Sequence, residues 1–220
     1  DRQLGVDSVV IYPPIELRPR KVKKENIILH VGRFRVVDKT VDLKDYKKQN
    51  VMVEAFKKMA RKMPSWKFIL AVSVKDDEQE DFTNLIKKAK GTPIEFSVNK
   101  SNDKLWEIYS RAKIYWHASG FGEDLTKQPE AAEHFGISTV EAMGAGAVPV
   151  VFNAGGQKEI VEDNVSGFLW GTLEDLEAKT LLLASENKIL ETMSRKAFAR
   201  ARDFHGPRFC EEIKKLIENG

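Results

Sequence analysis

The chain has 220 residues, of which 42% are hydrophobic and 31% charged, and this composition excludes a disordered chain, a collagen and a coiled coil. Its single cysteine, Cys210, excludes an internal disulfide and a zinc finger and is typical of a reducing compartment. The net charge of +3, from 36 basic and 33 acidic residues, does not indicate a nucleic-acid partner. Since no apolar run approaches about 18 residues, we expect a cytoplasmic protein without a membrane span.

Six short apolar runs rich in valine, isoleucine and aromatic residues are predicted to be strands buried on both faces. They lie at 27–31, 67–72, 94–98, 114–117, 148–152 and, more weakly, 168–170, and the first is expected to end at Gly32. Helical spacing of apolar residues follows at 51–63, 76–90, 103–112, 172–186, 188–203 and 207–218. This alternation predicts an α/β fold, a doubly wound parallel sheet of about six strands that is Rossmann-like.

The two ends of the chain read differently from the middle. Residues 1–24 are proline-rich and basic and are predicted to be a linker that leads in from a missing N-terminal domain, while residues 25–220 form one domain with C-terminal helices. The basic run at 18–24 is interpreted as a solvated linker, with contact to anionic lipid headgroups as the alternative. Cys210 lies in an amphipathic final helix and is expected to be a small core residue.

Ligands of open parallel sheets bind beyond the carboxyl ends of the strands, so the residues after each strand are the candidates for a site. Gly32 and Arg33 follow the first strand and precede a basic segment. A long polar loop, 119–132, follows the fourth strand, and 153–156 follows the fifth. We expect these segments to converge at one edge of the sheet.

A helix is predicted to begin after Gly136, because apolar residues follow it at helical spacing. The backbone amides of Ile137, Ser138 and Thr139 are then expected to be free at the positive end of the helix, where they form an anion site. Simple turn chemistry is the alternative for Gly136.

Two glutamates flank this predicted anion site. Glu133 lies in the loop before the helix, and Glu141 lies about one turn inside it. Carboxylates beside a phosphate suit hydroxyl groups on either side of it, as in a sugar joined through diphosphate to a ribose. Each glutamate alone is more often a solvated helix charge or a cap.

The segment from Glu133 to Glu141, with Phe135-Gly136 between the glutamates and EAMGAGAVPVV overlapping the second one, resembles the retaining family 4 glycosyltransferases of the GT-B fold. The resemblance covers about residues 26–205. It includes VGRF at 31–34, QNVMVEAF at 49–56, residues 105–112, and the glycine pair at 155–156 with Glu159. It implies the C-terminal, donor-binding half of such an enzyme.

The resemblance also implies roles for individual residues. Arg33 and Lys47 match the basic pair that contacts the donor diphosphate and stabilises the leaving nucleotide, and Glu133 matches the glutamate beside the donor sugar. Glu141 matches the residue that binds the ribose hydroxyls, and Val98 falls where the base is met. Phe135, Gly136 and Ile137 match the loop whose backbone meets the sugar and phosphate. Together with the helix-start and strand-end candidates, the expected substrate-binding residues are Gly32, Val98, Phe135, Gly136, Ile137, Ser138, Thr139 and Glu141.

Two departures from the family pattern leave alternatives open. Arg33 and Lys47 are separated by an insert at 36–46, so Lys44 or Lys48 is an alternative phosphate contact. The loop at 119–132, with Gly120-Phe121-Gly122, is long for the family and is either a mobile flap or a surface excursion. His117 and His134 either donate to a sugar hydroxyl or, as is more usual, are structural.

No Asp-x-Asp motif and no His/Cys cluster offers a divalent site, so we expect no metal and no cofactor besides a nucleotide-diphosphate sugar donor. The motif EHFGI favours mannosyltransferase-like relatives that use GDP-mannose, with a UDP-sugar nearly as well supported. The implied partners are the missing N-terminal acceptor domain and a saccharide or lipid-linked acceptor, with peripheral membrane association as an option.

The alternative functions are a sugar-nucleotide 2-epimerase of the same fold and a non-catalytic nucleotide-sugar-binding module. A dinucleotide dehydrogenase is disfavoured, because GRFR after the first strand lacks G-x-G-x-x-G.

Overall fold

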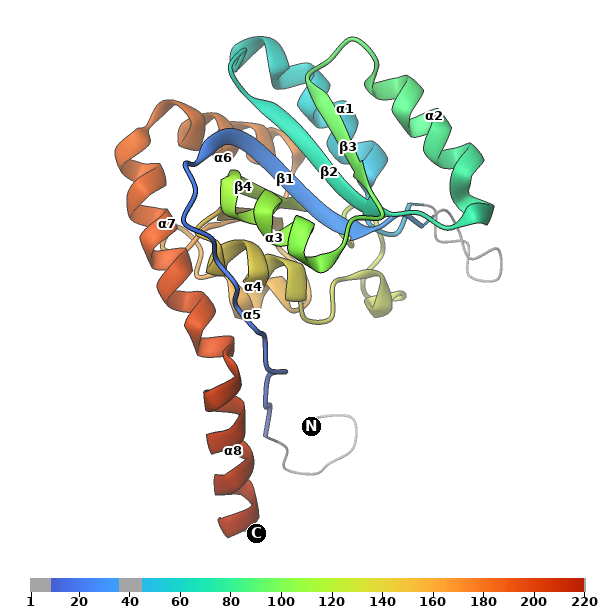
Figure 1. The fold of residues 1–220 in the computed structure, drawn as a ribbon. Coiled ribbons are helices and arrows are strands. Elements are labelled where there is room, and N and C mark those ends of the chain that lie inside the picture. Colours follow the sequence, from blue (N-terminus) through green and yellow to red (C-terminus); the bar gives the residue numbers. More distant parts are fainter. Residues whose placement is uncertain (1–8, 36–44, 220) are drawn as a thin grey trace.

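The computed structural model describes residues 9–35 and 45–219. Six parallel strands form one sheet in the order β3-β2-β1-β4-β5-β6 (Figure 1), which confirms the predicted doubly wound arrangement. The sequence order reverses between β1 and β4, and ligand sites of such sheets lie at this switch point. The strands are β1 (Glu25–Arg33), β2 (Lys67–Ser73), β3 (Ile94–Val98), β4 (Ala112–His117), β5 (Val148–Phe152) and β6 (Phe168–Trp170).

Apart from one short helix at Gln157–Ile160 that was not predicted, the helices follow the predicted order with small shifts of their ends. The helix predicted at 51–63 ends at Met59 and continues as a single 3₁₀ turn, and the acidic start predicted at 76 is also a 3₁₀ turn before α2. The described helices are α1 (Gln49–Met59), α2 (Gln79–Ala89), α3 (Asn102–Arg111), α4 (Ile137–Gly144), α5 (Gln157–Ile160), α6 (Leu173–Ser185), α7 (Asn187–Ala201) and α8 (Gly206–Asn219).

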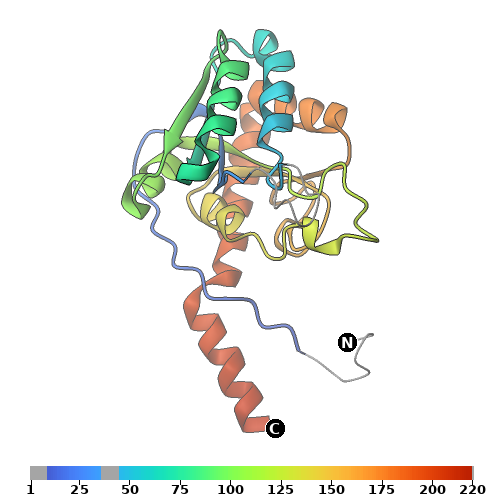
Figure 2. The same cartoon turned by 90° about the vertical axis from the view of Figure 1, so that its right-hand side faces the viewer.

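Helices cover both faces of the sheet, so the strands are apolar on both sides (Figures 1 and 2). In β1, Ile28 contributes to the core cluster shared with α1, α2 and α6, whereas Ile27 and Leu29 contribute to the cluster shared with α3, α4 and α7. This alternation is the two-residue period of a strand. The chain therefore has a complete core on each face of the sheet.

The first strand is longer than predicted. β1 was expected to end at Gly32, but it pairs with β2 through Gly32 and Arg33, which lie opposite Val72 and Ser73. The glycine has a strand-compatible backbone, and the neighbouring strand supplies partners for two further residues. Arg33 is thus carried on the sheet and not on a loop.

The segment before β1 packs along the domain. Ile15 is buried and donates its amide to the carbonyl of Phe204, while Tyr12 contacts the rings of Phe135 and Phe204. Leu17 lies over Gly144 at the end of α4. Tyr12, Ile15 and Leu17 of the predicted linker therefore pack on the core of the domain, whereas residues 18–23, which hold most of the basic run, are exposed.

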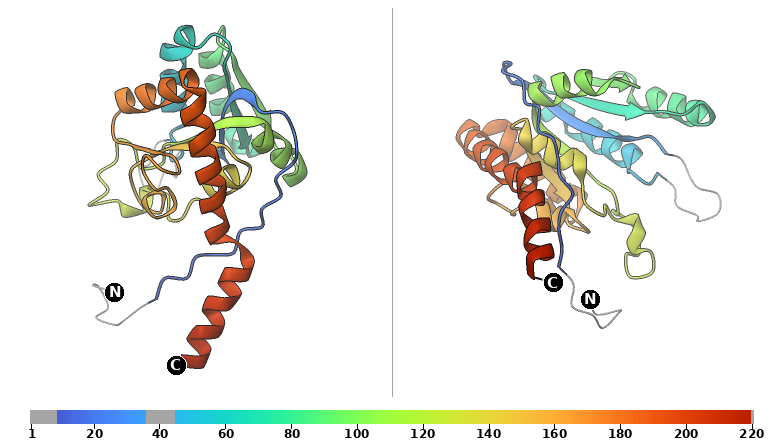
Figure 3. Two further views of the ribbon diagram at one scale, coloured as in Figure 1. Left: turned by 90° about the vertical axis from the view of Figure 1, so that its left-hand side faces the viewer. Right: turned by 60° about the horizontal axis from the view of Figure 1, so that its bottom comes forward.

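The last helix, α8, projects away from the body of the domain (Figures 2 and 3). The expectation that Cys210 is a core residue was wrong, because this helix has little of the domain to pack against and Cys210 is exposed. Leu216 and Ile217 are exposed as well. In the part of the chain that the structure describes, no helix is long and apolar enough to cross a membrane.

Candidate functional site

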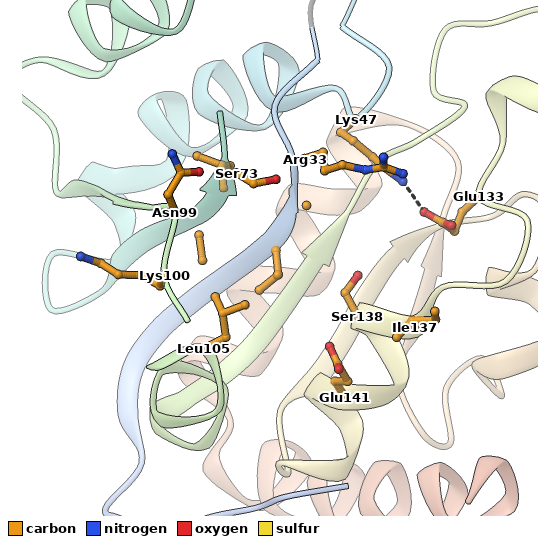
Figure 4. A pocket seen from close by; sticks show the side chains of 14 residues that line it. Arg33, Lys47, Ser73, Asn99, Lys100, Leu105, Glu133, Ile137, Ser138 and Glu141 are labelled. Atoms are coloured by element: carbon orange, nitrogen blue, oxygen red, sulfur yellow. Dashed lines mark hydrogen bonds and ion pairs between the residues drawn. The ribbon is translucent and has the colours of Figure 1, made fainter. Parts of the chain in front are cut away.

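A cavity of about 330 Å³ lies at the carboxyl ends of β1 and β2, beside the first turn of α4 (Figure 4). Arg33 and Lys47 point into it from one side, and Ser138 and Glu141 of α4 approach from another. Its lining consists of Val31, Gly32, Arg33, Lys47, Ala71, Val72, Ser73, Asn99, Lys100, Leu105, Glu133, Ile137, Ser138 and Glu141. Seven of the eleven predicted site residues are in this set.

The turn before α1 holds Lys47 in the cavity. The carboxylate of Asp45 accepts hydrogen bonds from the amides of Gln49 and Asn50, at 2.9 and 2.8 Å, and so caps the helix. Lys48 has a left-handed backbone with φ of 56°, which turns the chain sharply between the two lysines. Lys47 therefore lines the cavity while Lys48 pairs with Glu123, and the third candidate, Lys44, lies outside the described residues.

Glu133 is the centre of a small polar network. Its Oε2 lies 2.5 Å from Nζ of Lys47 and 3.0 Å from Nε2 of His117. Burial alone would raise the pKa of Glu133, but the hydrogen bonds and charges of His117 and Lys47 hold that pKa well below its usual range. Glu133 is therefore a carboxylate, bonded through one oxygen at the edge of the cavity.

The N-terminus of α4 begins at Gly136, as predicted. Its φ of 111° favours glycine, and a Cβ there would lie 2.7 Å from Nε2 of Gln157. One part of the predicted anion site was wrong: the amide of Thr139 is not free, because it donates to the carbonyl of Gly136 at 2.9 Å in a tight first turn. Ile137 and Ser138 hold the first two helical positions, whose amides have no acceptor within a helix.

Glu141 lies one turn further along α4 and is also held by a buried group. The hydroxyl of Tyr109, which is fully buried in α3, donates to Oε2 of Glu141 at 2.9 Å. Burial raises the pKa of Glu141, and the bond from Tyr109 offsets part of the rise. The carboxylate is thus oriented toward the cavity by a rigid partner.

Four predicted residues do not line the cavity. Phe135 packs against Tyr12 and Phe204, with ring centroids 5.6 Å apart in both cases, so its side chain anchors the loop on the core. Val98 ends β3, half-buried, and Thr139 is fully buried under the helix. Gly136 supplies the turn. None of these four residues therefore lines this cavity.

The sequence reasoning missed polar residues at the ends of β2 and β3. Ser73, Asn99 and Lys100 line the cavity on the side opposite Glu133 (Figure 4). Asn99 has φ of 49° and its side chain bonds both backbone groups of Val74, which fixes the turn after β3. The same rule that pointed to Arg33, reading the residues just after each strand, would have found them.

Two buried histidines lie in neighbouring strands: His30 within β1, and His117 as the last residue of β4. His30 is fully buried and its Nδ1 lies 3.1 Å from the carbonyl of Trp116; burial lowers the pKa of His30 to about 3. Gln49 donates to the carbonyl of Arg33 at 3.1 Å and lies 3.3 Å from Nε2 of His30. His134, in contrast, is exposed and does not reach the cavity.

The long loop at 119–132 is tied down at several points. Phe121 packs against Phe152 and Trp170, with centroids 5.6 and 5.2 Å apart, and Glu123 pairs with Lys48. The hydroxyl of Tyr46 donates to the carbonyl of Glu130 at 2.5 Å. These contacts favour a packed surface excursion over a flap.

Solved structures share this fold. An Anabaena protein, HepE, crystallised with UDP and glucose, matches 90% of this chain and 49% of its own with a TM-score of 0.70 and 21% identity. The C-terminal domain of a glycosyl transferase group 1 family protein from Francisella tularensis matches 86% of this chain and 93% of its own, with a TM-score of 0.64 and 18% identity. The architecture is that of the C-terminal domain of a GT-B glycosyltransferase.

The sequence profile of the family "Glycosyl transferases group 1" matches residues 15–200, and the chain belongs to this family. Among curated relatives, a GDP-Man:Man(3)GlcNAc(2)-PP-Dol alpha-1,2-mannosyltransferase from Dictyostelium discoideum is 29% identical, over 99% of this chain and 43% of the relative. The Xenopus laevis protein of the same description is 30% identical, over 77% of this chain and 35% of the relative. The chain thus spans less than half the length of these relatives.

Proposed function

We propose that this chain is the donor-binding half of a glycosyltransferase that takes its sugar from a nucleotide-diphosphate sugar, GDP-mannose being the favoured donor. The observation that carries the proposal is the arrangement of one cavity. Two basic side chains, Arg33 and Lys47, and the first turn of α4 surround it, and the carboxylates of Glu133 and Glu141 lie to either side. That order of charges matches sugar, diphosphate and ribose along an extended donor.

The diphosphate is proposed to lie between Arg33, Lys47 and the amides of Ile137 and Ser138. Breaking the bond between sugar and diphosphate builds negative charge on the leaving phosphate. Fixed cations and a positive helix end stabilise that charge as it develops. We propose that these groups do so without a metal; the described residues contain no group of three or more His, Cys, Asp or Glu side chains placed to hold one.

The two glutamates are proposed to bind hydroxyl groups. Glu133 is a carboxylate bonded through Oε2, and it accepts from the donor sugar at the end of the cavity nearest β4. Glu141, oriented by Tyr109, accepts from the ribose. The base then extends toward Asn99 and Lys100 at the end of β3.

Support for GDP-mannose comes from the relatives, whose descriptions name GDP-Man as donor and alpha-1,2-mannosyl transfer as reaction. The structural neighbour with UDP and glucose has the same fold at lower identity, so a UDP-sugar is the competing donor. We propose transfer with retention of configuration, on the resemblance of the Glu133–Glu141 segment to retaining enzymes.

The acceptor is proposed to bind a part of the protein outside this chain, which spans under half of its relatives. Those relatives are described as acting on Man(3)GlcNAc(2)-PP-Dol, a lipid-linked glycan. We therefore propose a lipid-linked acceptor, with the reaction at a membrane surface.

Calorimetric titration of the chain with GDP-mannose, UDP-glucose and ADP-glucose tests the donor site, and binding of none of them refutes it. In the full-length protein, we expect transfer of mannose from GDP-mannose to the lipid-linked trimannosyl glycan, and loss of it in Glu133→Ala. Transfer that survives this change with donor still bound would assign the chain to a non-catalytic binding module. A rearranged sugar formed without acceptor would identify a 2-epimerase.

A further inference from the structure

We infer that His117 is a positioning residue that keeps Glu133 aimed at the donor sugar when Lys47 turns to the diphosphate. The inference rests on the proposed function. It starts from a conflict of roles within the network: one carboxylate oxygen, Oε2 of Glu133, is held by two donors, Lys47 at 2.5 Å and His117 at 3.0 Å. One of these donors is the cation expected to bind phosphate.

Lys47 is the donor that can leave. It lies in the turn before α1 and reaches Glu133 with a flexible four-carbon side chain that lines the cavity. A diphosphate in the cavity competes with Glu133 for its ammonium, because phosphate oxygens are strong acceptors for charged donors. Once Lys47 moves, the partly buried carboxylate of Glu133 keeps its orientation only if another donor remains.

His117 is the donor that cannot leave. It is the last residue of β4, paired with Val151 of β5 in the interior of the sheet, and it is only 1% exposed. Its ring is covered by His30 from β1, with centroids 6.3 Å apart, and Ser119 lies 3.4 Å from its Nε2. Burial leaves the ring little room to turn, and in its observed orientation Nε2 is directed at Glu133.

The hydrogen-bond pattern also places the proton of His117. Nδ1 is buried and has no hydrogen-bond partner in the described part of the chain, whereas Nε2 faces an ionised carboxylate. The neutral ring therefore carries its proton on Nε2 and donates it to Glu133. Burial lowers the pKa of His117, and Glu133 raises it in part. His117 needs no charge for this role, only a donor at the Nε2 position.

Two amide side chains separate this role from simple packing. In His117→Gln the amide reaches about as far as Nε2 and restores a donor to Glu133, whereas in His117→Asn it reaches only the Nδ1 position. His117→Phe fills the space with no donor at all. The quantity to measure is the ratio of the affinities of the chain for GDP-mannose and GDP, by calorimetry, because Glu133 is expected to contact only the sugar.

We expect this ratio to fall about tenfold in His117→Phe and His117→Asn, as the loss of a hydrogen bond to a charged group implies, and to stay near the wild-type value in His117→Gln. Thr180→Val is the matched control: it removes a buried hydrogen bond from Trp116, the preceding residue of β4, at 3.0 Å on the opposite face of the strand. This variant should lower the melting temperature and leave the ratio unchanged.

The outcomes are distinguishable. If the wild type binds none of GDP-mannose, UDP-glucose and ADP-glucose, the proposed function fails and the inference falls with it. If it binds UDP-glucose instead of GDP-mannose, the same ratio is measured with UDP-glucose and UDP. If the wild type binds both ligands and His117→Phe loses affinity for both equally, the positioning role alone is overturned. If His117→Phe does not fold, the two amide variants decide. An equal ratio of GDP-mannose to GDP affinity in His117→Gln and His117→Asn then overturns the positioning role.

Discussion

The ammonium of Lys47 lies 2.5 Å from the carboxylate of Glu133, although the two residues are 86 positions apart in the chain. The turn before α1 and the loop before α4 bring them together beyond the carboxyl end of the sheet. In the unliganded protein, the proposed phosphate contact and the proposed sugar contact are thus paired with each other. Donor binding has to divide this pair.

Replacing Lys47 should therefore weaken both binding and turnover. We expect Lys47→Met to lower the affinity for GDP-mannose and to reduce turnover of the full-length protein by about 100-fold, since a group aimed at developing charge is lost. Isothermal titration and radiolabelled mannose transfer measure the two effects.

Lys48→Met is the control for Lys47→Met. Lys48 pairs with Glu123 of the 119–132 loop and does not line the cavity. We expect Lys48→Met to change the melting temperature. Its affinity for GDP-mannose should stay within about twofold of the wild type, a change in binding free energy below about 0.5 kcal/mol. A larger loss of affinity in Lys48→Met than in Lys47→Met would reverse the assignment of the phosphate contact.

The sequence predicted the sheet well because buried parallel strands carry continuous apolar runs, and it predicted the start of α4 because Gly136 precedes a helical pattern. The sequence-based prediction failed where contacts between distant segments determine the position of a side chain. Nothing in the local pattern shows that Phe135 turns to Tyr12 and Phe204, or that Cys210 lies on a helix projecting from the domain. Long-range pairs such as Glu133 with His117 are likewise fixed by packing of distant segments.

The ribose contact gives a second prediction. If Glu141 accepts from the ribose hydroxyls, Glu141→Gln should lower the affinity for GDP by about tenfold, equivalent to 1.4 kcal/mol. It should also reduce the preference for GDP over 2′-deoxy-GDP, because a neutral amide is a weaker acceptor than a carboxylate. Competition binding with both nucleotides measures the preference. Glu130→Gln, an exposed glutamate outside the cavity, should behave like the wild type, and an unchanged preference in Glu141→Gln would exclude the ribose role.

The same substitution should stabilise the unliganded protein at neutral pH. Burial raises the pKa of Glu141 in the folded state above its ordinary value of 4.5, so the folded protein binds more protons than the unfolded chain as the pH rises through this range. The protonated carboxyl of Glu141 is therefore the form that favours the folded state. At neutral pH the group is ionised, and burying its charge lowers the free energy of unfolding. We expect Glu141→Gln to unfold at higher urea than the wild type at pH 7, with the difference shrinking toward pH 4.5. A difference independent of pH would show that the charge is not its cause.

The last prediction concerns Lys24, whose side chain bonds the C-terminal ends of two helices, α3 and α4. Its Nζ donates to the carbonyls of Ala112 and Ala145, both at 2.7 Å, where α3 and α4 end. A cation is favourable at the negative end of a helix, and Lys24→Met leaves two carbonyls without this donor. We expect the change to lower the free energy of unfolding by about 2 kcal/mol.

The pH dependence of this loss has a definite sign. Burial lowers the pKa of Lys24 to about 8 in the folded state from its ordinary 10.5, so between these values the unfolded chain binds more protons and stability rises with pH. The difference between wild type and Lys24→Met should therefore widen from pH 7.5 to pH 10 in urea unfolding. Lys23→Met, at the exposed neighbouring position, should show neither the loss nor the widening. Equal stability of Lys24→Met and wild type across this range would mean that the amino group of Lys24 does not hold the two helix ends.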